Sequence, residues 1–446
     1  MNKVYQRILA SLLLGITPFS LNAKQWSLQE CINYALQNNI SIQKTHLQKV
    51  SANEDILSSK SQLLPTVTAT TNQNVQYTPW VASGVSSDGY QKVSVDKASY
   101  NGTYGINANW TIWNGNRNQN QVKLNKLAAQ QADLDSITTS QNIQEQIAQL
   151  YIQILYTTEA VKVNKESLEM SVKNEERGKE IFNVGKMSKA DLAQLTAQRA
   201  QDEYNVVSAE SQVRNYKRQM KQLLQITEVE EEFDIEVPTT TNEMALQAIP
   251  SMRSVYDAAL ENRPEIKSYQ NTIDQSNLNI KIAKASNLPT IGLNAGVSTN
   301  TTSMNSLAWG TQLKNNFAVG GGVSVSIPLF DNRSKKTSVN KAIITRDNAL
   351  LNLKDQQTNL YSTIENYWIQ ATNEQNQFKS AQISTKSAKE SYDLLSEQFA
   401  LGLKNIVELR NGKDNLLTAQ QNELQAKYLT ILNIDMLNFY KNGNIR

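Results

Sequence analysis

The sequence predicts an internally duplicated α+β membrane protein that combines very long antiparallel helices with two β-hairpins. Three observations lead to this prediction. Residues 116–182 contain no proline and a single glycine, Gly178, so nothing in this stretch disfavours a helix of 67 residues. A second copy of the stretch follows 217 positions later. Between residues 99 and 112, apolar and polar side chains alternate without a break, which is typical of a β-strand.

The repeat fixes the organisation of the chain. Gly185 is matched by Gly402, and the surrounding residues follow the same offset, whereas Pro65 and Pro289 differ by 224 positions. The difference of seven residues indicates a longer loop in the first hairpin. Because an internal repeat overrides other cues to the fold, we divide the chain into copies of one unit. The expected parts are a signal peptide (1–23), the first repeat (24–226), a connector (227–250) and the second repeat (251–443).

The composition excludes several classes of function. The net charge is only +3 at pH 7, which gives no support for a nucleic-acid partner. The single His46 and the single Cys31 exclude metal sites rich in histidine or cysteine, and also an intrachain disulfide. Histidine and cysteine, two residue types common in catalytic sites, are thus nearly absent. We therefore expect no enzymatic activity, no cofactor and no metal.

The first 23 residues predict a secretory signal peptide. Lys3 and Arg7 precede an apolar run over residues 8–19, and Ala23 ends a stretch typical of a cleavage site. The apolar run is too short to span a bilayer. Cys31 lies eight residues beyond Ala23, too far along for a lipidated first residue, so we expect it to pack within a helix.

A helix is expected before each hairpin. Ser27 and Glu30 have the spacing of a capping box, which predicts one helix from there to about Gln62. In the second repeat, Ser251 starts the equivalent helix. A Leu-Pro pair ends both helices, because a proline disfavours helix at the residue before it.

The hairpins are expected over residues 66–113 and 290–330. Strands of about ten residues, apolar on one face and small or polar on the other, are typical of transmembrane β-strands. A soluble sheet with one buried face is the alternative. The predicted signal peptide, the lack of a membrane-spanning apolar run in the mature sequence and the aromatic residues near the strand ends favour the membrane. Four strands cannot close a barrel, so membrane insertion requires an oligomer. The aromatic residues are Tyr77, Trp80, Trp110, Trp113 and Trp309.

Each hairpin leads into a long helix and a return helix. The long helices are expected over residues 116–182 and 333–399, and the return helices over about 189–225 and 406–440. All four are rich in polar residues, and their apolar residues form a narrow seam. Such a seam predicts helices that bury a thin interface, which fits a hollow tube better than a filled core. In the first long helix the seam contains Ile143, Ile147, Leu150 and Ile154. The acidic connector is expected to hold one short strand at Ile235–Val237.

Three motifs carry a resemblance to a known family. The spacing Phe-x-x-Gly-x-x-[Ser/Asn]-x-x-[Asp/Glu]-Leu occurs after both long helices, Leu-Pro-Thr opens both hairpins, and Ile-Pro-Leu-Phe-Asp-Asn-Arg precedes the second long helix. Together they resemble the TolC-like outer-membrane efflux protein family, also called outer membrane factors, over essentially the mature chain. The resemblance implies a homotrimer whose 12-stranded transmembrane β-barrel continues into an α-helical barrel, a tunnel across the periplasm.

The resemblance also implies a function and partners. It implies a passive outer-membrane channel of a tripartite efflux or type I secretion system, which receives substrates from an inner-membrane pump through a periplasmic adaptor. The expected location is the outer membrane, with an extension into the periplasm. A periplasmic adaptor or coiled-coil scaffold protein is the alternative, although an adaptor has one helical hairpin flanked by compact β-domains. An envelope enzyme with coiled coils is a further alternative, disfavoured by the composition.

The turns after the long helices contain the candidate site. The sequence predicts left-handed C′ caps at Gly185 and Gly402, helix N-caps at Ser188 and Asn405, and capping-box acids at Asp191 and Glu408. By resemblance these turns form the periplasmic tip that contacts the adaptor, through Val184, Gly185 and Lys186 in the first turn and Leu401, Gly402 and Leu403 in the second.

By the same resemblance, Asp191, Lys404 and Glu408 match the region where the tunnel narrows to a gate. Three symmetry copies of Glu408 would form an acidic ring, which favours cations and resists anions. The alternative is that Glu408 serves only as a helix cap.

Overall fold

The computed structural model describes residues 25–80, 84–85, 92–93, 97–227, 233–239 and 241–444. The predicted signal peptide and the acidic residues 228–232 of the connector lie outside the described residues. The chain forms two compact units, and each unit contains segments from both sequence repeats. Unit 1 comprises Met1–Ile40, Ser140–Ala259 and Thr363–Arg446, and unit 2 comprises Ser41–Thr139 and Leu260–Ser362. None of the helices in the described ranges is long and apolar enough to cross a membrane.

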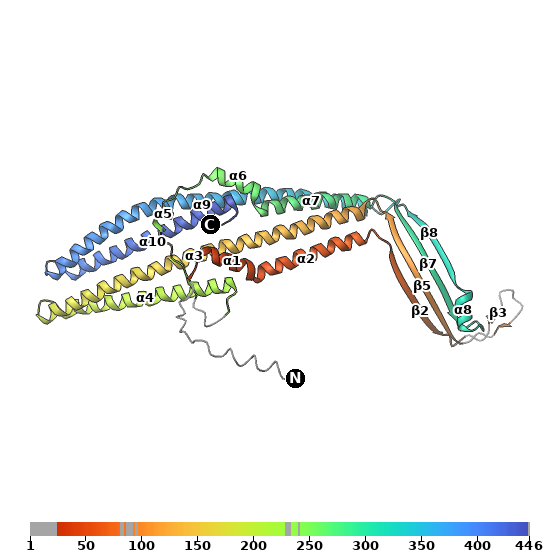
Figure 1. Ribbon diagram of the computed structural model, residues 1–446, viewed down its shortest axis with the longest axis horizontal. Coiled ribbons are helices and arrows are strands. Elements are labelled where there is room, and N and C mark those ends of the chain that lie inside the picture. Colours follow the sequence, from red (N-terminus) through yellow and green to blue (C-terminus); the bar gives the residue numbers. More distant parts are fainter. Residues whose placement is uncertain are drawn as a thin grey trace, which may run out of the picture. The chain divides into compact units, whose positions relative to one another are not determined.

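Unit 2 contains an antiparallel sheet, in which the two hairpins lie side by side (Figure 1). Its strands are β2 (Thr66–Tyr77), β5 (Ala98–Trp113), β7 (Thr290–Thr302) and β8 (Ala318–Ser326), in the order β2-β5-β7-β8. The first hairpin therefore joins the second through β5 and β7. Within the described residues, the outer strands β2 and β8 of this sheet each have one neighbour. The short strands β3 (Gly84–Val85) and β4 (Lys92–Val93) pair separately in the loop between β2 and β5.

The strand register separates an apolar face from a polar one. Ala69, Ile106, Val297 and Val319 are aligned across the four strands, and the next row contains Asn107 with small or hydroxylated partners. Much of this apolar surface is not covered by other parts of the described chain, since Val319 is 73% exposed and Val323 is 68% exposed. The predicted alternation is confirmed. We call the face that carries these side chains the apolar face of the sheet.

The helices that precede the hairpins are each broken in two, which corrects the prediction of continuous helices. In the first repeat, α1 (Leu28–Asn38) is followed by α2 (Ile40–Ser61), and Asn39 between them is extended. The Asn39 amide donates to the carbonyl of Leu223 at 2.9 Å, a distant contact that no local pattern indicates. The predicted capping box of Ser27 and Glu30 is present at the start of α1, and Cys31 is fully buried there.

The equivalent break in the second repeat has a local cause. Helix α6 (Met252–Asn262) ends before Arg263, and α7 (Pro264–Ala285) begins with a proline. Arg263 is extended, with ψ 129°, because the ring of Pro264 disfavours helical geometry at the residue before it.

The long helices α3 (Arg117–Asn183) and α9 (Ser334–Ala400) each contain 67 residues. The return helices are α4 (Lys189–Leu224) and α10 (Ile406–Asn442). In the predicted seam, Ile147 and Ile154 of α3 are fully buried and Ile143 is nearly so. Much of the remaining helical surface is polar and exposed, as the sequence predicts.

A glycine inside each helical hairpin allows close packing. A methyl group at Gly178 of α3 would clash with Leu195 of α4, and one at Gly412 of α10 would clash with Leu395 of α9. The repeat offset of 217 matches Gly178 with Leu395 and Leu195 with Gly412. The two copies therefore use the same contact with the glycine and the leucine exchanged.

The connector supplies small elements to unit 1. Its strand β6 (Asp234–Ile235) pairs in parallel with β1 (Gln25–Trp26), close to the predicted position. The hydroxyl of Tyr151 in α3 donates to the carbonyl of Glu236 at 2.6 Å and holds the connector against the helix. Two short helices were not predicted: α5 (Thr241–Ala245) in the connector and α8 (Trp309–Asn315) between β7 and β8.

Candidate functional site

The two turns that end the long helices have the same backbone geometry. Gly185 has a φ of +72° and Gly402 a φ of +76°, the left-handed conformation that favours glycine. In each turn the N–H of the glycine and the N–H of the following residue donate back to the last turn of the helix, which is the Schellman motif. The bonds are Gly185 to Phe182 (2.8 Å), Lys186 to Ile181 (3.0 Å), Gly402 to Phe399 (2.9 Å) and Leu403 to Gln398 (2.9 Å). The predicted C′ caps are confirmed.

The N-caps of the return helices differ from each other. At the start of α10, Asn405 accepts from the N–H of Glu408 at 3.0 Å, and the Glu408 carboxylate accepts from the N–H of Asn405 at 3.3 Å. This is a complete capping box. At the start of α4, Ser188 accepts from the N–H of Asp191, but the Asp191 carboxylate accepts from the Ser188 hydroxyl at 2.8 Å. The prediction of a capping box at Asp191 is therefore correct for the bond to the Ser188 side chain and wrong for the reciprocal bond from the Ser188 N–H. Aspartate is one methylene shorter than the glutamate that usually closes this box.

Both turns present open, largely apolar surface. Val184, Leu401 and Leu403 are each about 70% exposed, with values of 68%, 74% and 71%. Lys186 is also exposed. A side chain added at Gly185 or Gly402 would meet no atom of the described chain within 4 Å. The predicted tip residues are thus free of contacts that would hinder a partner.

The structure brings two of the three predicted gate residues together. The ammonium of Lys404 lies 2.6 Å from the Glu408 carboxylate, and both side chains are partly exposed. The hydrogen bond from Lys404 lowers the pKa of Glu408, with a further contribution from the backbone N–H of Asn405. Within the described residues the Asp191 carboxylate bonds to Ser188, at the start of the other return helix. Lys404 therefore offsets part of the charge that an acidic ring of Glu408 would carry.

A buried polar cluster, which the sequence does not predict, lies one to two helical turns beyond Glu408. The Lys413 ammonium of α10 forms an ion pair with Asp202 of α4 and donates to the Ser171 hydroxyl of α3 at 2.5 Å. The Lys413 and Asp202 side chains are only 3% and 2% exposed. The hydroxyl of Ser171 in turn donates to Asp202. The three residues join three helices, and the sequence gives no signal for partners this far apart in the chain.

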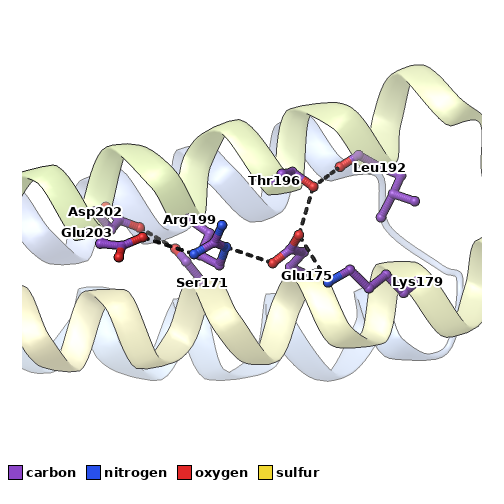
Figure 2. Close-up of polar contacts among 8 residues, drawn as sticks. All are labelled: Ser171, Glu175, Lys179, Leu192, Thr196, Arg199, Asp202 and Glu203. Carbon is purple, nitrogen blue, oxygen red and sulfur yellow. Dashed lines mark hydrogen bonds and ion pairs between the residues drawn. The ribbon is translucent and has the colours of Figure 1, made fainter.

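A second group of charges lies next to this cluster, between α3 and α4 (Figure 2). The Glu175 carboxylate accepts from Thr196 at 2.8 Å and pairs with Arg199 at 2.9 Å and Lys179 at 3.2 Å. Burial raises the pKa of Glu175, but the hydrogen bonds from Thr196 and Lys179 and the two cations outweigh it, so the pKa lies below its ordinary value. Glu175 is therefore held as a carboxylate.

Contacts within unit 1 also join the hairpin of α3 and α4 to the hairpin of α9 and α10. The Asn174 amide donates to the Tyr392 hydroxyl at 3.0 Å, and Arg177 donates to Ser396 at 3.1 Å. A buried apolar cluster takes side chains from both hairpins: Leu195, Tyr392, Phe399, Ile406, Leu409 and Leu416. The candidate site thus consists of exposed turns supported by a shared core with buried polar links.

This combination defines a class of protein. Paired long helices that end in exposed turns, attached to an amphipathic sheet with open outer strands, are the architecture of an outer-membrane export channel subunit. The model of the outer membrane efflux protein family matches residues 31–224 and 255–434, one stretch in each repeat. The chain belongs to the outer membrane efflux protein family, and it is an outer-membrane channel protein that extends into the periplasm.

Similar proteins agree with this assignment. The outer membrane protein TolC of Vibrio cholerae serotype O1 is 21% identical over 93% of this chain and 91% of its own length. Toxin and drug export protein A of Aggregatibacter actinomycetemcomitans is 21% identical over 67% of this chain. The matched stretch covers 63% of the length of that relative. Among solved structures, CusC has a TM-score of 0.79 at 14% identity, covering 94% of this chain and 92% of CusC, which shows the common fold. Nothing in these comparisons favours the periplasmic adaptor alternative.

Proposed function

We propose that three copies of this chain assemble into one passive export duct. In this assembly, β2 of one copy pairs with β8 of the next, so that three sheets of four strands close a 12-stranded barrel. The long helices of the three copies form the wall of a tunnel in the periplasm. Substrates pass through the duct from an inner-membrane pump, and the protein itself carries out no reaction.

The observation that carries the proposal is that each outer strand of the sheet has one edge without a neighbouring strand in the described part of the chain. Strands β2 and β8 each lack a second neighbour within the described residues, although the sheet has a continuous apolar face. In hydrocarbon an unpaired strand edge leaves backbone N–H and C=O groups unsatisfied, at a cost of several kcal/mol each. A single copy is therefore unstable in the membrane, whereas a closed ring of copies has no edge.

The tip and the gate have separate roles in this proposal. The exposed turns, with Val184, Gly185 and Lys186 in one and Leu401, Gly402 and Leu403 in the other, contact the periplasmic adaptor. Asp191, Lys404 and Glu408 lie next to these turns and constrict the tunnel. The support for these roles is the exposure of the turns and the position of the charged residues within one or two helical turns of them.

A matched pair of substitutions on β8 tests the membrane part of the proposal. Val323 belongs to the apolar face and the adjacent Ser324 to the opposite face, and both are exposed. An arginine at Val323 meets lipid and is expected to cost about 2–4 kcal/mol near the bilayer midplane, so outer-membrane insertion of Val323→Arg decreases. Ser324→Arg inserts normally and lowers the single-channel conductance for cations in a planar bilayer. Equal insertion of both variants would contradict the proposal.

A further inference from the structure

The segment between β7 and β8 is folded tightly onto the end of the sheet. It comprises residues 303–317 and contains α8. The Gln312 side chain, only 4% exposed, accepts from the N–H of Thr302 at 2.8 Å and donates to the Thr302 carbonyl at 3.1 Å. The same amide donates to the Leu307 carbonyl at 2.7 Å. Gln312 thus continues the hydrogen bonding of β7 and fixes the segment on the strand.

The segment lies on the apolar face of the sheet. The ring of Trp309 contacts the ring of Tyr104 edge-on, with centroids 6.1 Å apart, and Thr299 donates to the Leu313 carbonyl at 2.7 Å. Tyr104 and Thr299 are aligned partners on β5 and β7, two residues beyond the aligned pair of Ile106 and Val297. Because β5 and β7 are the inner strands of the sheet, α8 lies over these two strands near their far ends.

The segment is placed at the end of the strands away from the long helices. Strand β5 runs from Ala98 to Trp113 and then enters α3, whereas the segment follows the far end of β7 (Figure 1). Tyr104 of β5, which contacts Trp309, and Trp113 at the other end of the strand are nine residues apart, about 30 Å at the usual rise per residue. In a strand tilted by about 40° this spacing is about 23 Å, close to the ~25 Å height of the apolar band of an outer-membrane barrel. The segment is therefore at the level of the outer lipid headgroups.

The side chains of the segment suit that level. Four large apolar residues are about half exposed, namely Met304 (58%), Leu307 (45%), Trp309 (55%) and Phe317 (58%). Tryptophan and tyrosine are enriched at the boundary between headgroups and acyl chains. Residues 291–330 contain no acidic residue, and Lys314 is their only charged one. The segment thus carries one positive charge and no negative one, which favours an anionic lipid surface over a neutral one.

We propose that residues 303–317 bind the outer-leaflet lipid surface and fix the depth of the sheet in the membrane. The apolar side chains enter the headgroup boundary, and Lys314 contacts an anionic headgroup phosphate. This inference rests on the proposed function, because it requires the apolar face to be turned toward lipid.

Nitroxide labels at single introduced cysteines test the inference. The variants are Leu307→Cys in the segment, Val323→Cys on the apolar face and Ser324→Cys on the opposite face. Cys31 is fully buried, so labelling is directed to the introduced thiols, and unsubstituted protein measures the background. The full-length labelled proteins are reconstituted into phosphatidylcholine vesicles that contain phosphatidylglycerol. The ratio of collision rates with oxygen and with a water-soluble nickel complex then gives the depth of each label.

The expected ratio at position 307 is severalfold higher than at position 324 and lower than at position 323. A ratio at 307 equal to that at 324, with a high ratio at 323, would overturn the inference and leave the proposed function standing. Low ratios at both 307 and 323 would overturn both. Lys314→Gln is expected to lower the ratio at 307 in vesicles with phosphatidylglycerol and to leave it unchanged in pure phosphatidylcholine. An unchanged ratio in both vesicles would overturn the role of Lys314.

Discussion

Lys413 and Asp202 form an ion pair although their side chains are only 3% and 2% exposed. They belong to α10 and α4, and so to the two different helical hairpins of the chain. Removing one partner from a buried pair leaves an uncompensated charge, which typically costs about 3–5 kcal/mol, whereas replacing both partners by apolar residues is often neutral. The pair therefore couples the two hairpins near the tip.

Lys413→Met is expected to destabilise the helical part by about 3–5 kcal/mol, because Asp202 keeps its charge without a partner. The double variant Lys413→Met/Asp202→Leu should recover most of this loss. Thermal unfolding followed by helical circular dichroism compares the two with the unsubstituted protein. Equal melting temperatures of the single and double variants would show that the charge left behind is not the cause.

Glu408→Gln is expected to reduce the cation selectivity of the channel without unfolding the start of α10. Glutamine can replace glutamate in a capping box, so the bond to the N–H of Asn405 is kept while the charge is lost. Single-channel recordings under a salt gradient measure the selectivity through the reversal potential. An unchanged reversal potential would indicate that Glu408 is a helix cap and contributes no acidic ring.

Gly402→Trp is expected to abolish pump-dependent efflux while the protein still assembles. The left-handed backbone costs a non-glycine residue roughly 1–2 kcal/mol, but no neighbouring atom of the described chain obstructs the new side chain. Gly185→Trp should act in the same way. Gly443→Trp is the matched control, since Gly443 is also left-handed and lies at the opposite end of α10 from the Gly402 turn. Efflux assays with normal transport in the Gly402 variant would rule out the turn as the adaptor contact.

Asp435 on α10 is expected to make the helical part less stable as the pH rises. Burial raises the pKa of Asp435 to about 7, whereas the unfolded chain releases this proton near its ordinary pKa of about 3.9. The folded state therefore holds more protons between these values, and its stability falls from pH ~4 to pH ~7 and then levels off. Asp435→Asn removes the effect, with a gain of about 4 kcal/mol at pH 8 and about 1–2 kcal/mol at pH 5. Equal gains at the two pH values in thermal melts would contradict this cause.

The sequence predicts the elements whose signals are local. Both long helices begin and end within one residue of the predicted positions, since each lacks proline and ends in a glycine cap. The caps at Gly185 and Gly402 follow from spacing alone. The break before Pro264 also has a local signal, the proline itself, which the prediction of one continuous helix overlooked.

The remaining features depend on contacts between distant residues. The break at Asn39 is accompanied by a bond to Leu223, and Lys413 is buried only because Asp202 and Ser171 lie on neighbouring helices. Without these partners, a lysine and an aspartate in polar helices are expected on the surface. Helix α8 is short and has no side-chain cap, so it carries no start signal either.

The number of copies in the membrane-extracted protein tests the central claim most directly. Native mass spectrometry of the full protein, purified from outer membranes in mild detergent, is expected to give three copies of one chain that separate on heating. Three copies agree with a closed ring of twelve strands, in which β2 and β8 pair between neighbours. A stable single copy, inserted in the membrane with both edge strands unpaired, would contradict the account.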